Sequence, residues 1–189
     1  MTTIHAPSFP TTRSRSGVRS AAAVLAATGA LALAGQLRIP LPWTPVPATL
    51  QTFVLFFAAA LLGPGRGAAA PTLLWAGGAA GLPLFQGGAA GLAYSLGPTG
   101  GYLLAWIPAA AIVGAAAARS GRTLALAMAG ASLLVLAVGT IWLAAITGTA
   151  LATAATAGFL PFLPADAVKV AAAWCGTRAF RGPVRRALD

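Results

Sequence analysis

The chain has 189 residues, of which 58% are hydrophobic and 7% are charged, with a formal net charge of +10. Soluble domains contain about 25% charged residues, so too few polar side chains are present to cover a water-exposed surface, and lipid must cover much of it. The charge does not indicate a nucleic-acid-binding protein, because the arginines are scattered among apolar segments and form no basic stripe. We therefore expect one compact all-α membrane domain.

The first apolar run follows three arginines, Arg13, Arg15 and Arg19, and resembles a secretion signal. However, the run from Ser20 to Leu37 has nearly the length of a membrane span, and five more apolar segments follow it. We interpret it as a retained first helix that follows a basic tail at residues 1–19.

Glycine and proline divide the rest of the chain. The prolines of residues 38–47 prevent a helix there, and Gly63-Pro64-Gly65 and Arg119-Ser120-Gly121-Arg122 mark two turns. The glycine-rich stretch 81–97 and residues 147–164 are expected to connect helices. Five further spans are predicted, which with the first give a membrane domain over residues 20–180 and a second basic tail at 181–189: Ala48–Leu62, Gly67–Ala80, Gly100–Ala118, Thr123–Ile146 and Ala165–Phe180.

The distribution of arginine predicts the orientation. With six spans and both termini in the cytoplasm, the segments outside the cell contain Arg38, and those inside contain Arg13, Arg15, Arg19, Arg66, Arg119, Arg122, Arg178, Arg181, Arg185 and Arg186. Positive residues accumulate in cytoplasmic loops, so we expect an N-in, C-in topology. Residues 38–47, 81–99 and 147–164 then face outward and are expected to converge on one pocket.

Asp166 and Lys169 are the strongest candidates for contact with a polar ligand. The chain has two acidic residues, Asp166 and the final Asp189. At a spacing of three residues, Asp166 and Lys169 share a helix face, and charges at membrane depth usually face an interior or a cavity. The alternative is that Asp166 caps its helix while Lys169 extends toward the membrane surface.

The glycine-rich stretches offer two weaker candidates. Residues 81–94 suit a loop over a pocket, with Phe85 and Tyr94 as walls and Gln86 as a polar group, or else a plain connector. In Gly97-Pro98-Thr99-Gly100-Gly101-Tyr102 the glycines would allow a ligand to approach the backbone, or would serve helix packing. No Lys followed by Ser or Thr comes after these glycines, which disfavours phosphate binding.

Other residues indicate packing, and none indicates catalysis. Alanines recur every fourth residue in the first helix, a pattern typical of close helix packing within the bundle or against a partner subunit (Ala22, Ala26, Ala30 and Ala34). The five tryptophans are expected at helix ends or membrane interfaces. With one cysteine (Cys175), one histidine (His5, in the tail) and a single internal carboxylate, we expect no catalytic set, no metal site and no enzyme. No ATP-binding motif is present, so ATP-driven work would need a partner.

Several of these runs together resemble the BioY family, the biotin-binding S components of energy-coupling factor (ECF) transporters. The similarity extends over roughly residues 20–180, and its most specific parts are the Gly-Pro-Thr-Gly-Gly-Tyr run and the Pro-Phe…Asp…Lys run. The matching runs are Thr49-Leu50-Gln51-Thr52, Leu62-Gly63-Pro64-Gly65-Arg66-Gly67, Gly81-Leu82-Pro83-Leu84-Phe85, Gly97-Pro98-Thr99-Gly100-Gly101-Tyr102-Leu103 and Pro161-Phe162-Leu163-Pro164-Ala165-Asp166-Ala167-Val168-Lys169.

The resemblance implies a six-helix bundle in a bacterial-type inner membrane that binds biotin from outside. It also implies a transmembrane coupling subunit with two ATPase subunits as partners, docked on the alanine strip. The alternatives are a self-sufficient transporter or channel for biotin or another small vitamin, and a membrane scaffold without transport. The residues expected to contact biotin, with no cofactor or metal, are Gln51, Phe85, Gln86, Gly91, Tyr94, Gly97, Thr99, Gly100, Gly101, Tyr102, Asp166 and Lys169.

The resemblance leaves the orientation of the ligand open. In one hypothesis Asp166 accepts a ureido N–H of biotin and Lys169 donates to the ureido carbonyl. In the other, Lys169 pairs with the biotin carboxylate and Asp166 orients the lysine. The outer loop departs from the family pattern, so an amide that contacts the ligand is either Gln86 or missing.

Overall fold

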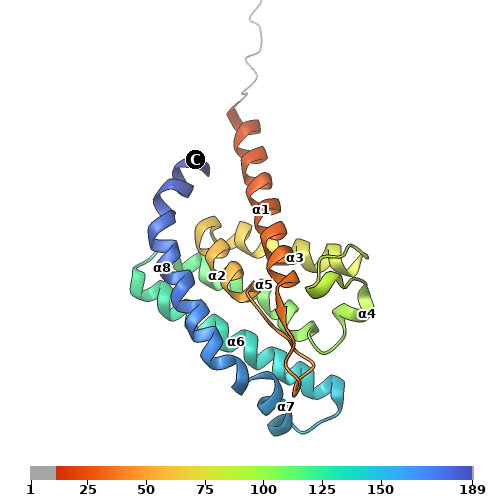
Figure 1. Cartoon of the computed structure of the whole chain (residues 1–189). Coiled ribbons are helices and arrows are strands. Elements are labelled where there is room, and N and C mark those ends of the chain that lie inside the picture. Colours follow the sequence, from red (N-terminus) through yellow and green to blue (C-terminus); the bar gives the residue numbers. More distant parts are fainter. Residues whose placement is uncertain (1–11, 189) are drawn as a thin grey trace, which may run out of the picture.

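The structure is a computed structural model that describes the backbone of residues 12–188 and the side chains of residues 17–182. Long helices dominate it, joined by short elements (Figure 1). In chain order the elements are α1 (Thr12–Gln36), β1 (Arg38–Ile39), β2 (Ala48–Thr49), α2 (Gln51–Leu62), α3 (Pro64–Ala79), η1 (Gln86–Gly88), α4 (Leu92–Ser95), α5 (Gly100–Ala116), α6 (Gly121–Thr147), α7 (Leu151–Gly158), η2 (Leu160–Phe162) and α8 (Leu163–Leu188).

Each of the six predicted spans overlaps one of the longer helices, but the helices differ in length. Within the described residues, three stretches are long and apolar enough to cross a membrane, at Gly17–Gln36, Gly121–Thr147 and Leu151–Gly182. Helix α2 has 12 residues, or about 18 Å at 1.5 Å per residue, and an apolar core is about 30 Å thick. The composition and these stretches identify a membrane protein, and the count of six spans stays a prediction.

The helix ends follow the glycine and proline signals closely. Helix α2 ends before Gly63, which has a φ of +83°, and Pro64 is the first residue of α3. A proline is tolerated at that position because its missing N–H would have no partner inside the helix. Ser120 accepts a hydrogen bond from the Thr123 N–H and caps α6. The two predicted turns are therefore confirmed.

The expectation that residues 147–164 form only a connecting loop was wrong. Gly148, with a φ of +67°, ends α6, and the chain then forms α7 and the short 3₁₀ helix η2 before α8. The alanines of residues 150–157 favour a helix, and no polar pattern there separates a short surface helix from a loop. Residues 38–47 contain no helix, as predicted, but β1 and β2 pair as short antiparallel strands at their two ends.

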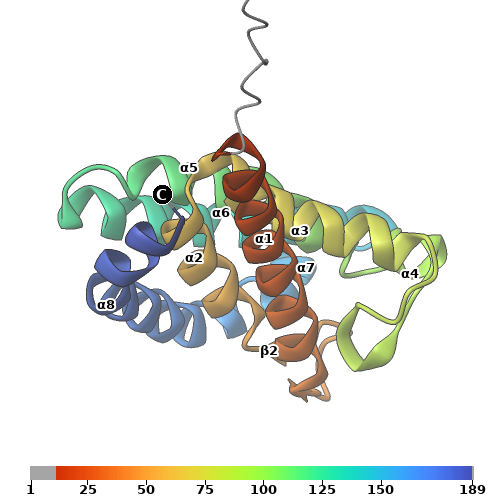
Figure 2. The same cartoon turned by 90° about the horizontal axis from the view of Figure 1, so that it is seen from above.

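Helix α5 lies at the centre of the bundle and packs against α2, α3 and α6. Val113 on α5 and Met128 on α6 are completely buried. Close approach depends on glycine, because a Cβ on Gly101 would overlap the Trp142 side chain and one on Gly139 would overlap the Tyr102 ring. Figure 2 shows α1 crossing in front of α3, beside α2, so that α1 covers one face of the bundle.

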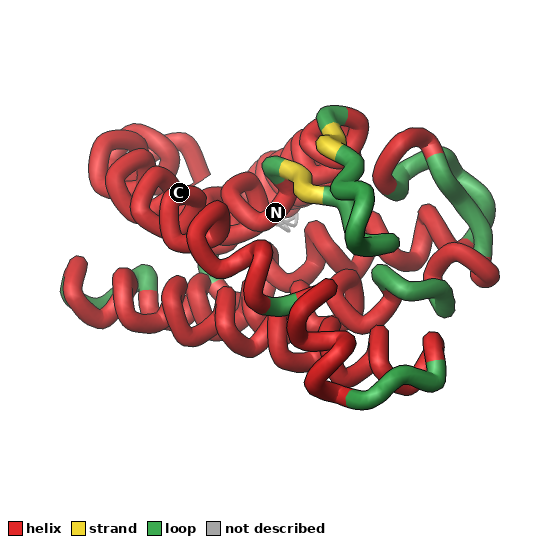
Figure 3. Tube along the Cα trace, turned by 60° about the horizontal axis from the view of Figure 1, so that its bottom comes forward, coloured by secondary structure: helices red, strands yellow, loops and turns green. Residues whose placement is uncertain are grey.

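The irregular segments gather at one end of the bundle. Figure 1 shows the beginning of α1 and the end of α8 on one side, with α7 and the strands on the other. In Figure 3 the strands and the loops next to them lie together over the helices. Residues from all three predicted outer segments, among them Val46, Gln86 and Phe162, line a single cavity. The predicted convergence of these segments is confirmed.

Candidate functional site

The cavity lies between α2, α5, α6 and α8, beneath the irregular segments. It contains about 580 Å³ of empty space, including its open mouth. Sixteen residues line it, nine of them aliphatic or aromatic and seven polar or charged: Val46, Pro47, Thr49, Gln51, Thr52, Gln86, Tyr94, Thr99, Tyr102, Leu103, Trp106, Val135, Leu136, Phe162, Asp166 and Lys169.

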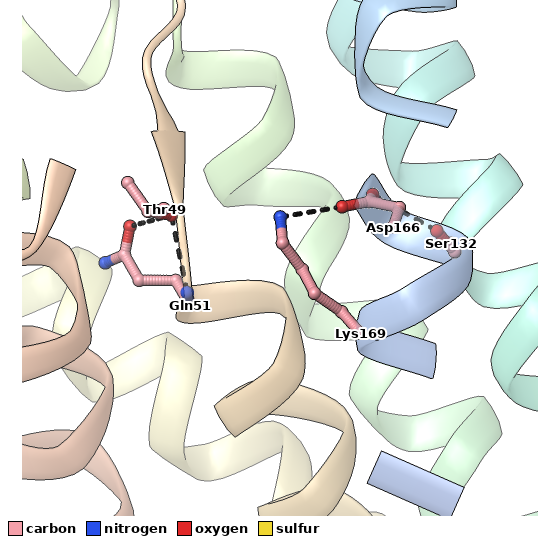
Figure 4. Close-up of polar contacts among 5 residues, drawn as sticks. All are labelled: Thr49, Gln51, Ser132, Asp166 and Lys169. Carbon is pink, nitrogen blue, oxygen red and sulfur yellow. Dashed lines mark hydrogen bonds and ion pairs between the residues drawn. The ribbon is translucent and has the colours of Figure 1, made fainter. Parts of the chain in front are cut away.

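A hydrogen-bonded chain of three side chains forms one wall of the cavity. Lys169 Nζ donates to Asp166 Oδ1 at 2.9 Å, and the Ser132 hydroxyl on α6 donates to Asp166 Oδ2 at 3.2 Å (Figure 4). Asp166 is 4% exposed and the lysine side chain 12%. A buried carboxylate without partners would be strongly disfavoured, so these two donors are what allow the charge to lie here.

This geometry bears on the two interpretations of the Asp166–Lys169 pair. Asp166 lies in the first turn of α8, as a cap would, but both of its oxygens accept from side chains. In Figure 4 the Lys169 amine points across the cavity toward the start of α2 rather than away from the bundle. An ammonium has three N–H donors, and the bond to Asp166 uses one, so the pair can present both a donor and an acceptor to a ligand.

The opposite wall is formed by the start of α2. The Thr49 hydroxyl donates to Gln51 Oε1 at 3.2 Å and accepts from the Gln51 backbone N–H. Gln51 Nε2 donates to the Leu31 carbonyl of α1 at 3.1 Å, so the side chain of Gln51, 3% exposed, is already held by protein. Gln51 therefore connects this wall to α1 and has little freedom to rearrange around a ligand.

Aromatic side chains provide the apolar surface of the cavity. Tyr102 and Trp106 contribute from α5, and Phe162 contributes from η2. The Tyr102 hydroxyl donates to the Gly158 carbonyl at 2.8 Å, which fixes the ring against α7. Tyr94 lines the cavity from α4, and Phe85, completely buried, stacks on it with centroids 5.1 Å apart.

Comparison with known proteins identifies the family. The family model described as "BioY family" matches residues 7–186. The chain belongs to the BioY family. It is 38% identical to a biotin transporter BioY of Rhodobacter capsulatus over 144 residues, covering 66% of this chain and 73% of the relative. It is equally identical, over 129 residues, to a probable biotin transporter BioY of Pyrococcus horikoshii, covering 68% and 76%.

A solved structure of similar fold is the S component for biotin from an ECF-type ABC transporter. The TM-score is 0.82, the sequence identity is 27%, and the match covers 92% of this chain and 95% of the other. The all-helical BioY fold described above is thus shared over nearly the whole chain.

In this BioY chain, seven of the twelve residues predicted to contact a ligand line the cavity, and five do not. Those that line it are Gln51, Gln86, Tyr94, Thr99, Tyr102, Asp166 and Lys169. Phe85 lies behind Tyr94, and Gly91, with a φ of +94°, begins α4. Gly97, Gly100 and Gly101 approach protein atoms of Tyr94, Ser95 and Trp142 instead, which favours their role in packing.

The cavity also contains residues that were not predicted. Trp106 was expected at a helix end or interface, but it is 5% exposed in the middle of α5 and lines the cavity. Val135, Leu136 and Leu103 were missed because every face of these helices is apolar, and periodicity cannot show which face meets a cavity. Ser132 did carry a signal, because it is an isolated polar residue in an apolar stretch of α6.

The alanine strip of α1 divides into two parts. Ala22, Ala26 and Ala30 are exposed, whereas Ala34 is buried at 7% exposure. Helix α1 therefore offers an exposed face of small side chains from Ala22 to Ala30, and this face does not extend to Ala34. The predicted tail residue His5 lies outside the described residues.

Proposed function

We propose that this chain is a biotin-binding membrane subunit that captures biotin at the outer face of the cell membrane and delivers it inward. The observation that carries the proposal is the cavity that contains the buried Asp166–Lys169 pair, found in a chain whose family relatives are named as biotin transporters. The relatives indicate biotin as the ligand, and the cavity provides an acceptor and a donor that can bind it.

Biotin has two ureido N–H donors, a ureido carbonyl, an apolar thiophane ring and a carboxylate tail. Asp166 accepts and Lys169 donates within one face of α8, so the pair matches the ureido group, which has both functions side by side. The rings of Tyr94, Tyr102 and Trp106 suit the thiophane ring and the apolar part of the tail. In the alternative orientation, Lys169 pairs with the carboxylate and Asp166 orients the lysine.

The transport direction rests on the predicted topology. Six spans with both termini inside place the cavity mouth, formed by residues of 38–47, 81–99 and 147–164, on the outer side. Arg66 in the first turn of α3, Arg119 in the turn before α6 and Arg178 in the second half of α8 do not line this cavity, in keeping with the accumulation of positive residues inside a bacterial-type inner membrane.

The proposed partners are a transmembrane coupling subunit and two ATPase subunits. Support comes from the fold shared with the S component of an ECF-type ABC transporter and from the exposed face of Ala22, Ala26 and Ala30 on α1, which allows another helix to approach closely. The relatives named simply as biotin transporters favour a second candidate, transport of biotin by this subunit without the ATPases.

Binding of labelled biotin to the purified protein tests the central claim. We expect saturable binding with a submicromolar Kd, and unlabelled biotin displaces it whereas thiamine and riboflavin do not. A Kd of 1 µM corresponds to a binding free energy of about −8 kcal/mol. The proposal is overturned if the protein shows the circular dichroism of a folded helical chain and does not bind biotin at 1 µM.

Uptake separates the two transport candidates. Cells that lack their own biotin uptake are given this chain with or without the coupling and ATPase subunits. Uptake that needs those subunits supports the ECF assignment, and equal uptake without them supports the self-sufficient transporter.

A further inference from the structure

A second hollow, lined by arginines, lies at the other end of α6 and α8 from the biotin cavity. Its open space is about 830 Å³, and it is lined by Gly121, Arg122, Leu124, Trp174, Thr177, Arg178 and Arg181. Arg181 also lines a neighbouring hollow that contains Arg66. From Asp166 to Arg178 is about 18 Å along the helix axis, so the two sites are separate.

No carboxylate among the described side chains neutralises these guanidinium groups. In the part of the chain whose side chains are described, Asp166 is the one acidic residue, and its ion pair is with Lys169. Arg122, Arg178 and Arg181 therefore face one open hollow with three positive charges. Guanidinium groups bind phosphate oxygens through two parallel hydrogen bonds, which makes phosphate the best chemical match.

The hollow is organised before a ligand binds. Trp174 Nε1 on α8 donates to the Gly121 carbonyl at the start of α6, with a length of 2.8 Å. The Arg178 guanidinium lies over the same indole ring, 4.9 Å from its centroid. One tryptophan thus joins the two helices and holds an arginine against the wall, which lowers the entropy lost on binding.

The surroundings favour a phospholipid as the source of the phosphate. Along α6, Arg122 is followed at helical spacing by the exposed Leu126 and Leu133. Along α8, Arg178 is preceded at the same kind of spacing by Cys175, Ala171 and Val168, all exposed. Both stripes lead from the arginines along apolar membrane helices, where acyl chains can lie while the head group reaches the guanidinium groups.

We propose that this hollow, between the start of α6 and the last turns of α8, binds the head group of an anionic phospholipid. The proposal does not depend on biotin binding, because its observations and its test concern the lipid alone. A basic hollow between membrane helices at the membrane surface is a known type of lipid site, and each arginine there is expected to contribute about fivefold to affinity.

Native mass spectrometry of the purified chain tests this with dioleoyl phosphatidylglycerol and dioleoyl phosphatidylcholine, which share their acyl chains. We expect the wild type to retain phosphatidylglycerol at least tenfold more tightly. The triple variant Arg122→Gln, Arg178→Gln, Arg181→Gln should lose this preference, a change of roughly 100-fold. The control is Arg119→Gln, which removes a charge beside the hollow from a residue that does not line it, and should change retention less than twofold.

Three outcomes would overturn the proposal: equal retention of the two lipids, a triple variant that keeps the preference, or an equal loss in Arg119→Gln. Millimolar inorganic phosphate should leave the bound lipid in place, and its displacement would instead indicate a site for a soluble anion. If the triple variant does not fold, the single variants Arg122→Gln and Arg178→Gln are tested instead, and each should retain phosphatidylglycerol about fivefold less tightly than the wild type.

Discussion

The two sides of the cavity are held in place by different means. On one side, Asp166 and Lys169 of α8, with Ser132 of α6 behind them, form the polar wall. A hydrogen bond of 3.2 Å from Ser132 to Asp166 joins the two long helices, and one of 2.9 Å joins Lys169 to Asp166 within α8. On the other side, the glycine-rich segment, residues 81–99, contains only η1 and α4 as regular structure. Its backbone has positive φ at Gly81, Gly87, Gly88 and Gly91, which glycine adopts without steric cost.

The glycine-rich segment is attached to α1 more than to the polar wall. Gln36 Nε2 near the end of α1 donates to the Phe85 carbonyl at 3.2 Å, and the Arg38 guanidinium lies against Gly87. The polar wall thus presents fixed charges, whereas the segment offers backbone and aromatic surface held to the end of α1 and to α3. We infer that the wall determines which ligand binds, and that the segment controls how fast the ligand leaves.

The substitution Asp166→Asn should have the largest effect on biotin affinity. It keeps the shape of the side chain but removes the charge that pairs with Lys169, leaving a lysine at 12% exposure without its counter-ion. Loss of one partner from a buried charge pair costs about 2–5 kcal/mol, so we expect Kd to rise by about 30-fold to several thousandfold. Isothermal titration with biotin measures this.

A control for Asp166→Asn is Arg119→Gln, which changes the net charge elsewhere and should leave the Kd unchanged. If Asp166→Asn binds biotin like the wild type, the polar wall is not the recognition site, and the comparison between the two sides of the cavity fails.

The substitution Lys169→Ala should raise Kd by roughly 30-fold, since it removes a charged donor from the wall. The two ligand orientations are separated by measuring how the wild type and this variant bind biotin and a biotin amide, in which the carboxylate is blocked. If Lys169 holds the ureido carbonyl, the wild type binds the amide as well as it binds biotin. If Lys169 pairs with the carboxylate, the amide binds the wild type weakly, and Lys169→Ala no longer distinguishes the two ligands.

A substitution on the glycine-rich segment should act mainly on dissociation. Tyr94→Leu removes the ring that lines the cavity and stacks on Phe85 at 5.1 Å, and aromatic pairs contribute about 0.5–1.5 kcal/mol beyond their buried area. We expect roughly a tenfold loss of affinity, mostly as a faster off-rate in stopped-flow measurements. Phe180→Leu, at an exposed aromatic on α8, should change neither rate. An effect confined to the on-rate would contradict the proposed division of roles.

These differences explain which parts of the site were predictable from the sequence. The polar wall stood out because charges are rare in an apolar chain, and Asp166 and Lys169 are indeed joined in the structure. The glycine-rich segment was recognised from its composition, but Phe85 proved to support Tyr94 rather than to line the cavity. Glycines that approach a ligand and glycines that approach a helix have the same local sequence, so the sequence could not show that Gly100 and Gly101 lie against Ser95 and Trp142.

The fold was predictable wherever a break in the sequence coincides with a helix end. Gly63 and Ser120 mark such ends and fit the structure. The helix α7 was not predictable, because its short alanine- and threonine-rich sequence resembles a loop. Trp106 was not assigned to the cavity either, because α5 is apolar on all sides and only tertiary packing determines which side faces the ligand.

The substitution Ser132→Ala should have an effect as small as that of Tyr94→Leu and is the most specific test of the polar wall. The Ser132 hydroxyl donates to Asp166 Oδ2 from a position that is 5% exposed and does not itself line the cavity. Its loss removes one of the two donors that hold the carboxylate, and a hydrogen bond to a charged group contributes about 1.5–3 kcal/mol. Because the Lys169 bond remains, we expect a loss of biotin affinity near the lower end of this range, roughly tenfold.

Ser120→Ala is the matched control on the same helix, since it removes the cap of α6. It should lower the free energy of unfolding by about 1 kcal/mol while the Kd for biotin stays the same. If both serine variants lower the thermal unfolding temperature and neither changes the Kd, Ser132 stabilises the bundle alone and does not position the carboxylate for the ligand.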